Sequence, residues 1–452
     1  MTRLLDDDSL RAALERLRAT NRQSAEAYPG ERADRQPVHT VYGGAHLFSH
    51  DVAAKLGAAA LRLMEDYAPD PSTFARAIGL PGTGEPAGAV HARVMEKLRH
   101  EPVEDFRIDF EDGYGMRPDA EEDRHAVEAA AAMARGALEH TLPPFAGIRI
   151  KPLTAELHAR SLRTLDRFLG ALLEGTRGTL PRNFVVTLPK VTNAEQVATL
   201  ADAFERIEKS AGLFPGALQM ELMVETTQMI VGPEGRSLLP EFVHAARGRC
   251  RGAHFGVYDY TAACGVTAAH QTLRHPACDF ARHVMQVALA GTGVTLSDGA
   301  TNVLPVPPHA APPGGALGPA ERAANARVVH AAWRAHYDDV RHSLRHAYYQ
   351  GWDMHPGQLP TRFAAVAAFF LESRAEAAAR LKTFVEKAAQ ATLLNNVFDD
   401  AATGQALLNF FLRGVNCGAL TEREALATGL TLDELRGRSF VKILAARRGA
   451  QG

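Results

Sequence analysis

The chain has 452 residues, of which 46% are apolar and 23% charged, and its formal net charge is −2. This composition is ordinary for a globular protein, and the length predicts one large domain with additions or two to three domains. The near-neutral charge excludes a global field that would draw the molecule to nucleic acid or to an anionic membrane.

The four cysteines have no CxxC spacing, so they predict neither a zinc site nor structural disulfides. The first residues lack the basic flank and apolar core of a signal peptide, and no apolar run approaches the length of a membrane span. We therefore expect a cytoplasmic protein whose partner is a small molecule, without nucleic acid or membrane as a partner.

Residues 1–36 are polar, with helical spacing of leucines, and predict an N-terminal helical arm. A β-prone run at 38–42 and a helical pattern at 51–67 form a first strand–helix unit, and the Pro- and Gly-rich segment 68–89 predicts a loop or insertion. Further β-prone runs, most of them separated by helical patterns, lie at 106–110, 147–150, 184–188, 222–226, 254–260, 293–296 and 352–356.

Eight strand candidates that alternate with helices predict an α/β fold, a (β/α)₈ TIM barrel over residues 37–360. A proline-rich excursion interrupts it at 304–319. From residue 361 to 452 the patterns are helical throughout, which predicts an α-helical C-terminal extension that packs on the barrel or on a neighbouring subunit.

Ionisable side chains stand at or just after the ends of the predicted strands, where such barrels gather their chemistry. They are Glu111, Asp112, Arg149, Lys190, Glu225, Asp259, Asp298 and His355.

Two acids among them, Glu225 and Asp259, follow consecutive strand candidates and predict a site for Mg²⁺, with Mn²⁺ as an alternative metal. The alternative is that one caps the following helix and the other forms a surface ion pair.

The remaining residues of this set suit an enolate reaction on a metal-chelated carboxylate. Arg149 is expected to face the substrate carboxylate or carbonyl, because its planar fork can bind two oxygens. Glu111 and Asp112 are expected to support metal-bound water or Arg149, and Lys190 to act as a further catalytic cation. The general base stays open between His355, a carboxylate and a group from another subunit.

Two further residues, Gly256 and Tyr258, are expected to line the substrate pocket; packing of the strand-end loops is the alternative for the tyrosine.

Six short blocks in this order resemble the citrate lyase β-subunit/malyl-CoA lyase family of HpcH/HpaI-type aldolases. They are Ile108-Asp109-Phe110-Glu111-Asp112, Ile148-Arg149-Ile150, Leu188-Pro189-Lys190-Val191, Val224-Glu225-Thr226, Gly256-Val257-Tyr258-Asp259 and Met354-His355-Pro356-Gly357-Gln358.

The resemblance implies a TIM barrel that forms homo-oligomers, with Glu225 and Asp259 as Mg²⁺ ligands and Arg149 as the enolate arginine. Lys151 and Thr192 stand where the family has asparagine and glutamate, and the turn after the first strand also differs, so a CoA thioester substrate stays open.

The favoured hypothesis is thus a Mg²⁺-dependent carbon–carbon lyase or aldolase that acts on a 2-oxo or 2-hydroxy carboxylate. One alternative is a phosphoenolpyruvate or pyruvate enzyme on the same barrel, since Lys151 beside Arg149 could favour a phosphate. Another is an inactive barrel that serves assembly or partner binding.

Overall fold

A closed barrel of eight parallel strands forms the centre of the computed structural model, which describes residues 7–30, 32, 34–81, 85–312, 315–386, 392–394, 397–399, 401–437 and 440–449. The predicted (β/α)₈ fold with a C-terminal helical region is confirmed. The strands are β1 (His39–Gly44), β2 (Asp105–Asp109), β3 (Phe145–Arg149), β4 (Phe184–Leu188), β5 (Gln219–Val224), β6 (Cys250–Phe255), β7 (Thr295–Ala300) and β8 (Gln350–Asp353).

The barrel closes by parallel pairing of the first and last strands, in which Thr40 lies opposite Trp352. Helices fill the connections between strands, as the alternating pattern predicts. They include α2 (Val52–Tyr67), α4 (Glu85–His100), α5 (Asp119–Glu139), α6 (His158–Gly175), α7 (Ala194–Ala211), α9 (Leu239–Ala245), α11 (Pro276–Leu289) and α12 (Pro319–Arg345).

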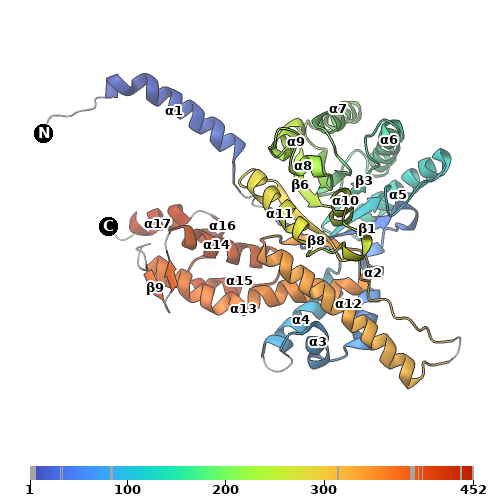
Figure 1. Ribbon diagram of the computed structural model, residues 1–452. Coiled ribbons are helices and arrows are strands. Elements are labelled where there is room, and N and C mark those ends of the chain that lie inside the picture. The colour runs from blue at the N-terminus through green and yellow to red at the C-terminus, as the bar shows by residue number, and fades with distance from the viewer. Residues whose placement is uncertain are drawn as a thin grey trace.

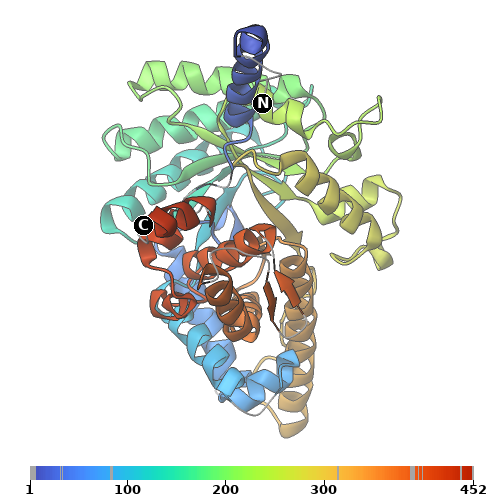
Figure 2. The ribbon, with the colours of Figure 1, turned by 90° about the vertical axis from the view of Figure 1, so that its left-hand side faces the viewer.

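The helices divide into two groups (Figures 1 and 2). α5, α6, α7, α9 and α11 surround one side of the barrel, whereas α12, α13 (Leu359–Glu386), α3 (Pro71–Ile78) and α4 pack together on the other side. The C-terminal helices α14 (Ala401–Asn416), α16 (Leu432–Arg436) and α17 (Phe440–Gly449) extend this second group. Helix α1 (Asp7–Ala27) projects away from both (Figure 1).

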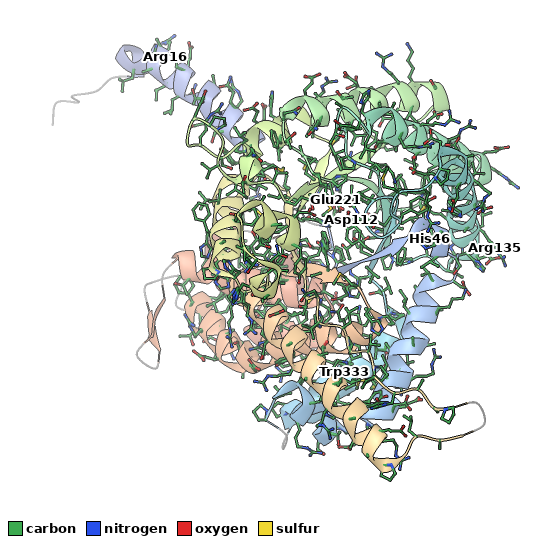
Figure 3. All side chains as sticks on the ribbon, turned by 45° about the vertical axis from the view of Figure 1, so that its right-hand side comes forward. Arg16, His46, Asp112, Arg135, Glu221 and Trp333 are labelled. Atoms are coloured by element: carbon green, nitrogen blue, oxygen red, sulfur yellow. The ribbon has the colours of Figure 1, made fainter. Side chains whose placement is uncertain are left out.

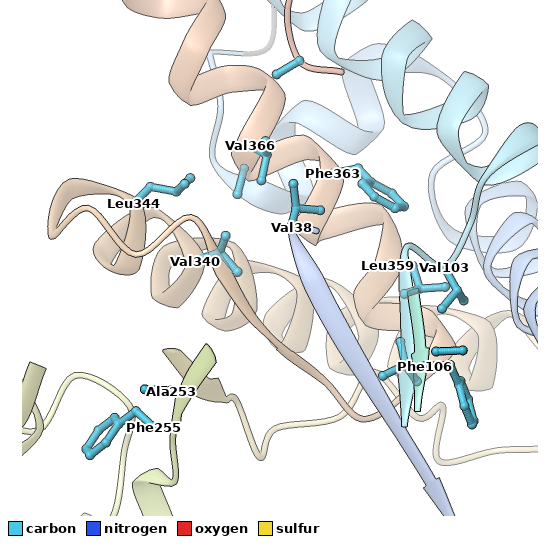
Figure 4. Close-up of a cluster of buried hydrophobic side chains, with 14 of the residues drawn as sticks. Val38, Val103, Phe106, Ala253, Phe255, Val340, Leu344, Leu359, Phe363 and Val366 are labelled. Atoms are coloured by element: carbon cyan, nitrogen blue, oxygen red, sulfur yellow. The ribbon is translucent and has the colours of Figure 1, made fainter. Parts of the chain in front are cut away.

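Apolar side chains join the barrel to α13 (Figure 4). Val38 precedes β1 and Val103 precedes β2, and both are almost completely buried with Leu359, Phe363 and Val366 of α13. Burial of this size stabilises by about 1.5–3 kcal/mol for each large side chain. The helical region is therefore part of the same core as the barrel.

Two local predictions are wrong. Segment 68–89 was expected to be a loop or insertion, and the loop alternative is wrong for residues 71–78. Asp70 caps α3 by accepting a hydrogen bond from the Thr73 amide, and Pro71 occupies the first helical position, so the proline starts a helix. The apolar run at 254–260 is not one strand, because β6 ends at Phe255 and helix α10 (Val257–Ala263) follows.

Besides its helices, the C-terminal region contains a short antiparallel pair, β9 (Thr392–Leu394) and β10 (Val397–Asp399), which the sequence patterns did not predict. Among the described helices, none combines the length and apolar character needed to cross a bilayer.

Candidate active site

The carboxyl ends of strands β2 to β6 bring five of the predicted residues to one end of the barrel. Glu111 follows β2, Arg149 is the last residue of β3, and Lys190 follows β4. Glu225 follows β5, and Asp259 lies in the first turn of α10, directly after β6. Parallel strands place these positions at the same edge of the sheet, which is why residues far apart in the chain meet here.

Lys190 connects the acids of this group. Its ammonium forms ion pairs with Glu111, with Asp112 at 3.1 Å and with Asp259 at 3.6 Å. Burial works against the charge, but Glu111 raises the pKa of Lys190 above its ordinary value, so the lysine stays protonated. The backbone also matters: Lys190 has a φ of +50°, and its amide donates to Oε1 of Glu225 at 2.6 Å.

Glu225 is the most enclosed acid, with 2% of its surface exposed. Burial, followed by the negative charge of Asp259, raises the pKa of Glu225 to about 8, although Lys190 and Arg149 act in the opposite direction. Lys190 and Arg149 therefore do not offset the effects of burial and of Asp259 on the Glu225 carboxyl group. An all-oxygen donor set in this state fits a hard divalent cation such as Mg²⁺ or Mn²⁺.

No three of these described carboxylates bring one oxygen each within 4.8 Å of one another. A metal ion held by Glu225 and Asp259, the pair expected from the sequence, would thus have its other positions open to water or substrate. This is the arrangement that Mg²⁺ favours, because it keeps several waters.

Arg149 is held by a carboxylate that the sequence analysis did not single out. Asp109 on β2 accepts from Nε of Arg149 at 2.7 Å and from Nη2 at 2.5 Å. The remaining nitrogen, Nη1, lies 3.2 Å from Oε2 of Glu111, and the guanidinium lies 4.9 Å from the centroid of the Tyr42 ring. Asp109 therefore fixes the arginine and leaves Nη1 directed at the site.

The signal for Asp109 was present in the sequence. Residues 105, 107, 109 and 111 are all charged and alternate with apolar neighbours, which places them on one face of β2. That face lines the barrel interior, where Arg107 is buried and bonds to Glu221 at 2.7 Å. Charged side chains therefore lie in the centre of the barrel as well as at its mouth.

Glu111 and Asp112 differ in their surroundings. Burial raises the pKa of Glu111 above its ordinary value against the pull of Arg149 and Lys190. Asp112 is 61% exposed in its side chain and lies at the rim; Figure 3 shows it in the barrel half, away from Trp333 of α12.

Two other predicted residues have different surroundings. Gly256 lies against Glu225, whereas Tyr258 donates its hydroxyl to the Ala300 carbonyl oxygen at 2.9 Å. Such a bond fixes the loop after β6 and leaves the ring half-buried.

The structure does not bring His355 into contact with the acids of the described site. Its ring accepts a hydrogen bond from the Gly357 amide at 3.0 Å, within its own turn after β8, and burial lowers its pKa. Asp298 also lies elsewhere than expected: it is inside β7, not at its end, and pairs with Arg282 of α11 at 2.9 Å.

Lys151, the residue considered for phosphate binding, is buried. Its ammonium bonds to the Phe110 carbonyl oxygen at 2.5 Å and pairs with Glu122 at 3.0 Å, so it is directed to α5. It offers no contact for a substrate phosphate at the barrel mouth.

Comparison with known proteins gives one family and a set of similar folds. Residues 17–443 match the profile of the family described as Domain of unknown function (DUF6986). No curated protein matches the sequence. A citrate lyase structure from Burkholderia xenovorans LB400 is 17% identical, with a TM-score of 0.53, and the alignment covers 90% of this chain and 100% of that one.

A Haloferax volcanii malate synthase, solved as a magnesium/glyoxylate complex, is 14% identical with a TM-score of 0.44, over 90% of this chain and 98% of that one. At such identities the similarity to the citrate lyase shows a shared fold.

Proposed function

The chain belongs to the DUF6986 family, and we propose that it is a Mg²⁺-dependent carbon–carbon lyase or aldolase that acts on a 2-oxo or 2-hydroxy carboxylate through an enolate. The observation that carries the proposal is the pair Glu225 and Asp259 beside Lys190 and Arg149 at the carboxyl end of the barrel. A CoA thioester is one option for the second substrate.

Glu225 and Asp259 are the residues that would hold Mg²⁺. When bound, the metal would polarise the α-oxygen and carboxylate of the substrate as a Lewis acid. Because Glu225 lies deep and Asp259 is half-exposed, the substrate approaches from the Asp259 side.

The two cations bind and orient the substrate's oxygens. Nη1 of Arg149 donates to an oxygen on which negative charge develops, while Asp109 keeps the guanidinium plane fixed. The Lys190 ammonium, already placed among three acids, donates to a substrate carboxylate oxygen.

Glu111 is the candidate for proton transfer among the groups left open by the sequence. Its carboxyl lies between Arg149 and Lys190, and its raised pKa brings it closer to the neutral range in which a general base works well. His355 lies outside this group of contacts.

Solvent exchange tests the enolate step without knowledge of the second substrate. Pyruvate in D₂O with the protein and Mg²⁺ is followed by proton NMR, and we expect methyl protons to exchange only when both protein and metal are present. Glu225→Gln and Asp259→Asn should abolish the exchange, while Asp202→Asn, which changes an exposed carboxylate, should not. Absence of metal-dependent exchange across pyruvate, other 2-oxo acids and 2-hydroxy acids would overturn the proposal.

A further inference from the structure

Three metal-ligating side chains meet outside the barrel mouth, between α11 and the end of α12. One ligand atom each of Asp279, His342 and His346 lies within 4.8 Å of the others. Over the described residues, no other set of three histidine, cysteine or acidic side chains meets this closely. We propose that these three residues form a second metal site, for a divalent transition metal of the zinc class, that ties α11 to α12.

The two histidines lie one turn apart at the C-terminal end of α12, His342 in its last turn and His346 as its C-cap residue. His342 and His346 are four residues apart, and their ring centroids lie 4.3 Å apart. Two histidines one turn apart on a helix form a common pair of metal ligands because both rings project to the same side.

Their ring nitrogens are set for ligation. Nδ1 of His346 lies 2.9 Å from the His342 carbonyl oxygen, which accepts only, so Nδ1 carries the proton. This leaves Nε2 of His346 with its lone pair, in the tautomer that a metal requires. Nε2 of His342 lies 2.8 Å from Oδ1 of Asp279, within hydrogen-bond distance. A bound metal ion would take the place of the proton between these two atoms.

Asp279 keeps one carboxylate oxygen for a ligand. The side-chain bonds it receives from Arg282 and His342 both end on Oδ1. Arg282 has a second carboxylate of its own, since its Nη1 pairs with the buried Asp298 at 2.9 Å. The arginine's charge is thus neutralised without Asp279, which lowers the repulsion that a metal ion would meet here.

The ligand types select the metal. Two imidazoles and one carboxylate suit Zn²⁺ and its neighbours, whereas Mg²⁺ prefers oxygen donors alone. A tetrahedral zinc ion needs a fourth ligand, which is water or His283, whose ring centroid lies 5.5 Å from that of His346. The proposed site therefore differs in chemistry from the acids at the barrel mouth.

A metal at this position would strengthen an existing connection. Gln286 of α11 donates to the His346 carbonyl oxygen, and Tyr348, after α12, donates to the Arg282 carbonyl oxygen at 2.9 Å. Both bonds hold the same two helices together. If zinc binds only the folded state, its binding free energy adds to the free energy of folding. Zinc should therefore raise the melting temperature of the protein.

Zinc titration of the metal-free full chain, in excess Mg²⁺ to fill oxygen-only sites, tests the proposal. We expect one Zn²⁺ to bind and to raise the melting temperature. Asp279→Asn, His342→Gln and His346→Gln should each weaken zinc binding by at least ~10-fold. Loss of a residue that only supports a metal ligand already lowers metal affinity by ~10–100-fold, and loss of the ligand itself should lower it no less. His158→Gln is the matched control, because Nδ1 of His158 bonds to a carbonyl four residues earlier, as in His346.

Equal zinc affinity in the wild type and in all three variants would overturn the proposal. Crystals of the wild type soaked in Zn²⁺ give a second readout that does not depend on how the variants fold. The anomalous peak should lie between Asp279, His342 and His346, and a peak found only at another place would contradict the assignment.

Discussion

Glu225 packs so closely against Gly256 that a Cβ on residue 256 would lie 2.5 Å from both Cβ and Oε2 of the glutamate. The glycine is therefore required by the position of the carboxylate. It lets the turn after β6 approach the end of β5 and places Asp259, three residues later, beside Glu225.

Replacement of Gly256 by alanine should move the Glu225 carboxylate without removing it. We expect Mg²⁺ affinity to fall at least ~10-fold, as when an outer contact of a metal ligand is lost, while the circular dichroism spectrum stays unchanged. Gly170→Ala is the control, since a Cβ at that helical position meets nothing within 4 Å. Unaltered Mg²⁺ affinity in Gly256→Ala would mean that the contact does not hold the ligand.

Replacement of Lys190 by methionine should separate two effects of its charge. The ammonium competes with a metal for Asp259, 3.6 Å away, so its loss should tighten Mg²⁺ binding. The same change should lower the rate of pyruvate proton exchange, because a donor to the substrate is lost. Calorimetry and NMR on one preparation test both, and a variant that loses Mg²⁺ binding would show that Lys190 assembles the site instead.

Acid should release the C-terminal region from α4. Glu424, in α15 (Glu422–Ala425), accepts two hydrogen bonds of 2.8 Å from Arg93 of α4 and also pairs with Arg374. Burial opposes ionisation, but Arg93 and the Thr421 cap lower the pKa of Glu424 to about 2, below its usual 4.5.

A lowered folded-state pKa means that this stabilisation is complete above the unfolded value of about 4.5 and disappears as the pH falls toward 2. The difference in unfolding free energy between wild type and Glu424→Gln, measured by urea denaturation, should therefore be largest above pH 5 and shrink in acid. A difference that stays constant from pH 7 to pH 3 would contradict this role.

A buried carboxylate connects β8 to β1 and to helices α12 and α13. Asp353 is fully buried and bonds to His39 at 2.7 Å, to His336 at 3.0 Å and to Arg362 at 2.9 Å. Asp353→Ala leaves these partners without their anion and should destabilise the protein by roughly 3–5 kcal/mol. The exposed Asp202→Ala should stay within about 0.5 kcal/mol in the same denaturant titration. A loss below ~1 kcal/mol for Asp353→Ala would show that the network contributes little.

The barrel was predictable because its strands and helices alternate with regular spacing, and the acids at its mouth because parallel strands end at the same edge. What could not be predicted from the sequence was which residues, distant in the chain, contact each other in the fold. The charge alternation of β2 placed Asp109 on the interior face, but its pairing with Arg149 depends on the register of β2 and β3, which the sequence pattern does not give.

Segment boundaries were misjudged where local chemistry outweighed composition. Pro71 starts α3 with Asp70 as its cap, although its neighbourhood has the composition of a loop. His355 follows a strand, as expected, but its ring turns to the Gly357 amide within its own turn.

Calorimetric titration of Mg²⁺ into the metal-free protein is the most direct test of the central claim that Glu225 and Asp259 form a divalent metal site. We expect a binding isotherm for the wild type and for the surface variant Asp202→Asn, and its loss in both Glu225→Gln and Asp259→Asn. Mg²⁺ binding of unchanged affinity in either of the last two variants would contradict it.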